Sequence, residues 1–107
     1  MLVVPTIPIP YQIFTVQLNN QNCQISIYQK STGLFLDLYI SGTLIIGGVI
    51  CEDRNRIVRN AYLGFVGDLA FFDNQGSSDP FYTGLGSRYS LLYLDPSDAP
   101  VNVTSID

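Results

Sequence analysis

Hydrophobic and polar residues alternate one by one along the first half of the chain. In residues 14–18, for example, Phe14, Val16 and Leu18 alternate with Thr15 and Gln17. Successive side chains of a β-strand point to opposite faces of the sheet, so a period of two predicts half-buried strands. The segments that share this period are residues 14–18, 23–28, 34–40 and 43–50.

Short polar clusters separate these four segments. Residues 19–22 read Asn-Asn-Gln-Asn, residues 31–33 read Ser-Thr-Gly, and Ser41 is followed by Gly42. Connections this short join neighbouring antiparallel strands, so the pattern predicts a meander. Within the fourth segment Gly47 is followed by Gly48, and a glycine pair there predicts a bulge or sharp bend that curls the sheet.

The second half of the chain continues the β pattern less regularly. Residues 51–60 hold the densest group of charges and are expected to form a turn, with a strand resuming at residues 57–58, although a single helical turn also fits. Residues 67–73 and 89–94 are predicted strands, and residues 74–80 form a long polar loop. The predicted fold class is therefore all-β, a small antiparallel β-barrel or sandwich of about six to eight strands. No helix longer than about three turns is expected.

A chain of 107 residues is expected to form one domain. Residues 1–94 are assigned to a single β domain with an extended N-terminal arm set by Pro5, Pro8 and Pro10. Residues 95–107 are rich in Pro, Asp and Ser and are expected to form an extended tail. The apolar N-terminal run has no basic segment and is broken by the prolines, which argues against a signal peptide or a membrane span.

The composition favours an assembly subunit over a free monomer. Charged residues make up 13% of the chain, about half of the roughly 25% that is usual. The surface must then expose neutral and apolar side chains, and exposed apolar patches usually mark interfaces. The net charge of −4 and the presence of only five basic residues argue against direct binding of nucleic acid.

The two cysteines, Cys23 and Cys51, lie among apolar residues of predicted strands. Two cysteines are too few for a disulfide-dense scaffold. Both are expected to be buried free thiols.

Residues that could carry chemistry are scarce. The chain has no histidine, which excludes a Ser–His–Asp or Cys–His arrangement within one chain. Asp68 with Asp73 or Asp37 could form a pair of catalytic carboxylates, but turn capping and solvation are the better interpretation. Oxygen ligands for calcium could come from Asp68, Asp73, Asn74 and Asp79, but carboxylates in loops next to Gly and Pro are usually turn caps. We therefore predict no catalytic residue, no metal site and no cofactor.

The aromatic segment of residues 62–89 is the best candidate for a binding surface. Phe71 and Phe72 are adjacent in a predicted strand, so one can enter the core and the other lies outside, where a partner would be needed to cover it. Arginines near this segment can stack on such a ring or form ion pairs with Asp68 or Asp73 across a subunit boundary. The alternative is that these arginines belong to a solvated charged loop without such contacts. The candidate interface residues are Phe71, Phe72, Phe81, Tyr82, Arg54, Arg56, Arg59 and Arg88.

Two further segments are expected to contact other subunits. They are the loop of residues 74–80 and the N-terminal proline arm, because loops on a rigid β scaffold are common binding sites.

Beyond these patterns, the chain resembles the baseplate plug proteins of contractile-tailed bacteriophages, including cyanophage-type myophages. The resemblance covers nearly all of the chain to about Leu94, and its motifs are specific only in combination. The matching residues are Pro8-Ile-Pro10, Gln12, Phe14, Asn22-Cys-Gln-Ile25, Leu36-Asp-Leu38, Cys51, Asp53-Arg54, Val58 through Phe65, Gly67-Asp68, Asp73, Gln75-Gly76, Asp79-Pro80, Tyr82, Gly84-Leu-Gly86, Arg88, Leu92 and Tyr93.

The resemblance implies a structural protein of the virion tail baseplate, assembled in the host cytoplasm, and no enzymatic activity. It implies a plug or hub-associated component at the lower end of the tail tube. The implied partners are other copies of the chain, in a ring or plug of three- or six-fold symmetry by analogy, and baseplate hub, spike and tail-tube proteins; neither nucleic acid nor membrane is implied. The alternatives are a tail-tube initiator or other hub component, and a small ligand-binding β-barrel.

Overall fold

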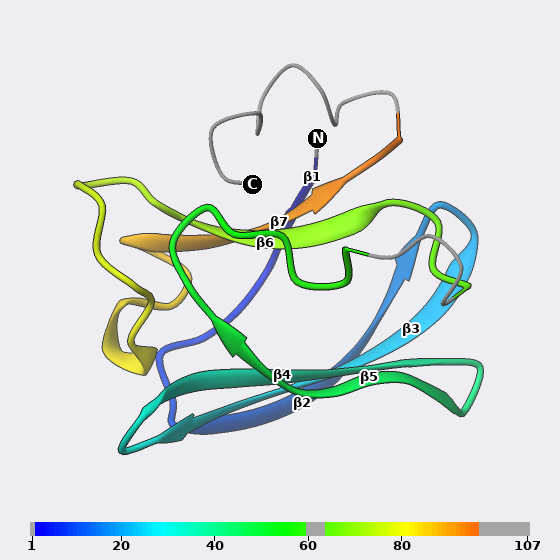
Figure 1. Ribbon diagram of the computed structural model, residues 1–107, viewed down its shortest axis with the longest axis horizontal. Helices are drawn as coiled ribbons and strands as arrows, with labels where there is room; N and C mark the ends of the chain where they lie inside the picture. Colours follow the sequence, from blue (N-terminus) through cyan, green and yellow to red (C-terminus); the bar gives the residue numbers. More distant parts are fainter. Residues whose placement is uncertain (1, 60–63, 97–107) are drawn as a thin grey trace.

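Two antiparallel β-sheets packed face to face make up the computed structural model, which describes residues 2–59 and 64–96 (Figure 1). One sheet has the strand order β2-β3-β4-β5 and the other the order β1-β7-β6. The prediction of a small all-β fold is confirmed, and of the two architectures considered the described residues form the sandwich, not a closed barrel. The strands are β1 Leu2–Val4, β2 Tyr11–Leu18, β3 Gln21–Lys30, β4 Gly33–Ile40, β5 Thr43–Cys51, β6 Asp68–Asp73 and β7 Tyr89–Leu94.

The four-stranded sheet is the meander that the alternation predicted. Two-residue turns join its strands, and their backbones are left-handed where a tight hairpin needs it: Asn19 and Asn20 have φ of 51° and 61°, and Ser41 and Gly42 have φ of 49° and 84°. Short turns of this kind fix the register, and the β2–β3 pairing runs without a break from Tyr11 opposite Tyr28 to Leu18 opposite Gln21.

A bulge lies in β5 at the predicted glycine pair. Ile46 and Val49 pair with Leu38 and Leu36, so Gly47 and Gly48 together face Asp37 alone. Gly48 has a φ of +65°, which glycine adopts easily. Its N–H donates a hydrogen bond of 2.7 Å to Asp37 Oδ1. The prediction of a bulge at this position is confirmed.

The three-stranded sheet contains one strand that the sequence pattern did not indicate. Leu2–Val4 pairs with β7, and the chain then passes from this sheet to the four-stranded one before β2 begins (Figure 1). The start of the expected N-terminal arm is therefore a sheet strand. A three-residue strand is too short to show a period of two, which explains why the pattern missed it.

The inner faces of both sheets enclose one hydrophobic core. Its fully buried side chains include Leu36 and Leu38 from one sheet, and Leu69, Phe71 and Leu91 from the other. Dense packing of such side chains between two sheets is what holds a sandwich together.

Both cysteines lie in this core. Cys23 and Cys51 are buried free thiols, as predicted. Burial raises the pKa of both thiols, most strongly that of Cys51. Their packing and chemistry are those of small hydrophobic residues.

Helical structure is limited to one 3₁₀ turn, Tyr82–Gly84, among the described residues. The prediction of a chain without long helices is confirmed for residues 2–59 and 64–96. Over the same residues, no helix combines the length and the apolar character required to cross a bilayer. The predicted C-terminal tail lies outside the described residues from position 97 onward.

The charged segment after β5 differs from its prediction. In place of a resumed strand at residues 57–58, the chain runs along β6 through single bridges, Asp53 with Phe71 and Arg56 with Ala70. Arg54 has a φ of 61°, which interrupts an extended backbone. Ile57 still donates a hydrogen bond of 2.9 Å to the carbonyl of Leu69. This segment therefore covers the outer edge of β6 without becoming a strand.

Candidate functional site

The Phe71–Phe72 pair divides between core and surface, as adjacent strand residues must. Phe71 is 1% exposed and belongs to the core, whereas Phe72 is half-buried on the outer face of β6. The guanidinium carbon of Arg54 lies 4.4 Å from the centre of the Phe72 ring, a cation–π contact. The expectation that only a partner could cover this ring was wrong, because Arg54 of the same chain lies over it.

The loop of residues 74–80 is held by Asp73 and Arg88. Arg88 donates two hydrogen bonds of 2.9 Å to the Asp73 carboxylate, from Nε to Oδ1 and from Nη2 to Oδ2. The backbone N–H groups of Gln75 and Ser78 donate to the same two oxygens. Hydrogen bonds with Arg88 and with these N–H groups hold the pKa of Asp73 well below its usual range.

Asp73 should therefore make stability depend on pH at the acid end. A carboxyl whose pKa is lower in the folded than in the unfolded state, where it is about 3.9, stabilises the fold above that value and loses this effect as pH falls below it. We expect wild-type protein to lose more unfolding free energy than Asp73→Asn between about pH 5 and pH 2. Urea unfolding across this range measures the difference, and parallel curves would contradict the assignment.

Two further contacts fix the loop from its other side. Asp79 Oδ1 accepts a hydrogen bond of 3.0 Å from the backbone N–H of Asp53. Arg54 Nη2 donates to the carbonyl of Gly76 at 3.3 Å. The loop is thus anchored at several points along its length, and it presents an ordered surface to the solvent.

Arg56 and Arg59 lie on the segment that runs along β6, where Arg56 bridges to Ala70 and the backbone N–H of Arg59 donates to Asp68. Arg59 Nε donates to the carbonyl of Arg56 at 2.9 Å. The Asp68 carboxylate accepts the backbone N–H groups of Val58, Arg59 and Leu69 at 2.7–2.9 Å. The carboxylates of Asp68 and Asp73 both accept hydrogen bonds within their own chain. Neither carboxylate therefore needs an arginine of a neighbouring subunit as its partner.

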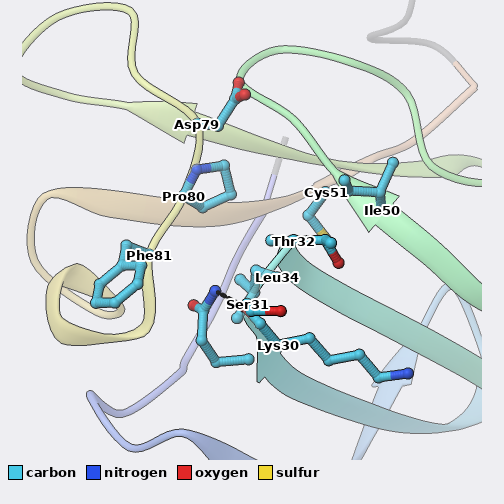
Figure 2. Close-up of a pocket in the computed structure, with 11 residues that line it drawn as sticks. Lys30, Ser31, Thr32, Leu34, Ile50, Cys51, Asp79, Pro80 and Phe81 are labelled. Carbon is cyan, nitrogen blue, oxygen red and sulfur yellow. Dashed lines mark hydrogen bonds between the residues drawn. The ribbon is translucent and has the colours of Figure 1, made fainter.

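Phe81 lines a cleft of about 450 Å³ (Figure 2), and Tyr82 is the next residue in the chain. The cleft separates the turn at residues 31–32 from the segment of residues 79–81. Phe81 is 48% exposed, and its ring centre lies 5.0 Å from that of Tyr82. The backbone N–H of Tyr82 donates to Gln29 Oε1 at 3.1 Å, which ties this rim to β3. An exposed ring on an anchored rim is suited to contact a partner.

The predicted site residues thus separate into distinct places. Arg54 and Arg88 contact the loop of residues 74–80, and Phe72 lies under Arg54. Phe81 lines the cleft, and Tyr82 follows it in the chain. Arg56 and Arg59 are neighbours on the segment beside β6, and Phe71 lies in the core.

A second surface, on the outer face of the four-stranded sheet, was not predicted. Strand register aligns Tyr11, Tyr28, Phe35 and Ile50 in one row across all four strands. We call this face the outer aromatic face. Ile13 lies on the same face as Tyr11, two residues along β2, and Leu44 lies there because it pairs with Tyr39. The exposed side chains on this face are Tyr11, Ile13, Leu44 and Ile50. The residues of the outer aromatic face are Tyr11, Ile13, Tyr28, Phe35, Tyr39, Leu44 and Ile50.

Two charged side chains, Asp37 and Lys30, contact the rings of the outer aromatic face. Tyr28 Oη donates to Asp37 Oδ1 at 2.9 Å. Burial and this hydrogen bond raise the pKa of Tyr28. Lys30 Nζ lies 5.6 Å and 5.4 Å from the ring centres of Tyr28 and Phe35. A signal was present in the sequence: in residues 34–40 the side chains between the leucines include Phe35 and Tyr39, so both faces of this strand are apolar.

Comparison with protein-family models finds one match over residues 1–96, to a family described as cyanophage baseplate Pam3 plug gp18. No curated protein matches the chain.

Proposed function

The chain belongs to this family of cyanophage baseplate plug proteins, and we propose that it is a structural subunit that plugs the lower end of a phage tail tube through contacts with hub, spike and tail-tube proteins. The observation that carries this proposal is the extent of the family match. It spans residues 1–96 and so includes all seven described strands, the anchored loop and the cleft rim.

The surface supports a role in protein–protein contact. Large apolar side chains remain exposed on the outer aromatic face and at the cleft rim, where soluble monomers usually keep few. Few charges have to be desolvated when such surfaces are covered, which favours stable association. A structural family and a chain without histidine favour a non-enzymatic role.

A test of this function is to locate the protein in purified virions. The chain carries a small peptide tag, and gold-labelled antibody is imaged by electron microscopy on tails. Label at the baseplate end of the tail, and co-purification with the tube, are expected. Gold label on the capsid, or purified particles that carry no label, would overturn the assignment.

Phe81→Ser is expected to reduce incorporation into particles roughly 30-fold, because loss of one interface aromatic weakens binding by about 2 kcal/mol. The subunit should remain folded, since Phe81 is largely outside the core. Quantitative immunoblotting of particles complemented with each variant measures the effect. Val66→Ser, at a residue of 46% exposure, is the matched control. Equal incorporation of both variants would remove Phe81 from the interface.

A further inference from the structure

The two sheets have four outer edges, and three of them are blunted. The edge at β5 carries the Gly47–Gly48 bulge and a second register shift after Leu38. The edge at β6 is covered by the segment after β5, through the N–H groups of Arg54 and Ile57. The edge at β1 is three residues long and is followed by Pro5. Bulges, covering segments, short strands and prolines all prevent pairing with another chain.

The fourth edge, β2, has none of these protections. It is eight residues long and pairs in unbroken register with β3 on one side. It contains neither a charged residue nor a proline. Among residues 2–59 and 64–96, β3 is the only strand that pairs with it. An edge of this kind presents a row of unpaired N–H and C=O groups, which is a template for another strand.

We propose that β2 is a docking strand and that its occupant is the β2 strand of a second copy of this chain, paired antiparallel across a two-fold axis. The unpaired backbone groups require an extended strand as partner, since their hydrogen bonds fit no other element. The pairing is a property of the isolated chain and does not depend on where the protein acts.

Charge and symmetry favour a second copy as this partner. The chain has a net charge of −4, yet no charge lies on β2, so two copies can pair without opposing charges there. A head-to-tail arrangement would need β5 as the complementary edge, and the bulge at Gly47–Gly48 breaks that edge. The remaining arrangement is an isologous contact in which β2 meets β2.

The alternation of faces restricts the register of this pair. Residues that oppose each other must point to the same side of the sheet, so Tyr11, Ile13, Thr15 and Gln17 of one copy face the same set in the other. When the two strands overlap over their whole length, the two-fold axis lies at the centre of β2, either at Phe14 or at Thr15. In both registers Thr15 lies at or next to the axis. Pairing also brings the exposed Tyr11 and Ile13, 57% and 50% exposed, beside the second copy.

A matched pair of lysine substitutions tests the proposal. Thr15 and Thr43 are exposed threonines on β2 and β5, the two edges of the same sheet. Thr15→Lys places two like charges close together at the axis and is expected to weaken dimerisation about tenfold or more, whereas Thr43→Lys leaves it unchanged. Sedimentation equilibrium over a concentration series measures the equilibrium between the 11.8 kDa chain and its dimer.

Amide hydrogen exchange on wild-type protein provides a test that needs no variant. The β2 N–H groups that do not bond to β3 should be protected at high protein concentration and should exchange freely on dilution. A wild-type chain that stays monomeric up to about 1 mM would overturn the proposal. So would a dimer whose β2 amides stay unprotected, or equal dimerisation of the two lysine variants.

Discussion

Phe71→Ser is expected to lower the free energy of unfolding by about 4 kcal/mol, whereas Phe72→Ser should lower it by only about 1 kcal/mol. The two residues are adjacent in β6, but Phe71 is enclosed by the core and Phe72 lies under Arg54 on the outside. Loss of Phe71 leaves a cavity and buries a hydroxyl, and a domain of this size has only about 5–15 kcal/mol of stability. Urea unfolding followed by circular dichroism measures both values.

The comparison also separates folding from assembly. Because Phe72→Ser should stay folded, light scattering on this variant reports whether the Arg54–Phe72 pair contacts a neighbour. Phe72→Leu is the control, since leucine keeps the apolar bulk and removes the ring that attracts the guanidinium. Equal losses of stability in Phe71→Ser and Phe72→Ser would show that the strand does not have these two faces.

The strands of the meander were predictable because each is long enough to show its alternation. β2 to β5 have eight to ten residues each, with turn residues between them. Gly47 and Gly48 marked the bulge because few other residues adopt a positive φ inside a strand. The features that the sequence missed depend on distant segments. β1 is defined by β7, and the segment after β5 is shaped by its hydrogen bonds to β6.

The candidate site was predicted only in part, for a related reason. The division of Phe71 and Phe72 between core and surface was predicted, but which of the two is buried was not. An arginine over the outer ring was also expected, but the choice of Arg54 among the four candidates depends on a chain reversal that local patterns do not encode. The outer aromatic face was overlooked because Phe35 and Tyr39 occupy positions that an alternating strand would give to solvent. The open edge of β2 can be recognised only after the order of strands in the sheet is known.

The second large effect is expected at Asp68. This residue was considered as a metal ligand or an ion-pair partner, but its buried carboxylate accepts three backbone N–H groups. Asp68→Ala leaves these donors without acceptors, and each buried donor without a partner costs about 1–3 kcal/mol. We expect the free energy of unfolding to fall by about 4 kcal/mol.

Two further substitutions make the Asp68 prediction specific. Asp68→Asn keeps Oδ1, which accepts from Val58 and Leu69, but can turn an amide N–H toward the donor of Arg59, so its loss should be about half as large. Asp79→Ala is the matched control, because Asp79 is exposed and accepts one backbone N–H, and it should cost about 1 kcal/mol or less. The expected order of stability is therefore Asp79→Ala, then Asp68→Asn, then Asp68→Ala. Urea unfolding at neutral pH gives this order directly. If Asp68→Ala were as stable as Asp79→Ala, the segment beside β6 would be held by its apolar contacts at Ile57 and Val58, and the carboxylate would be available for a partner after all.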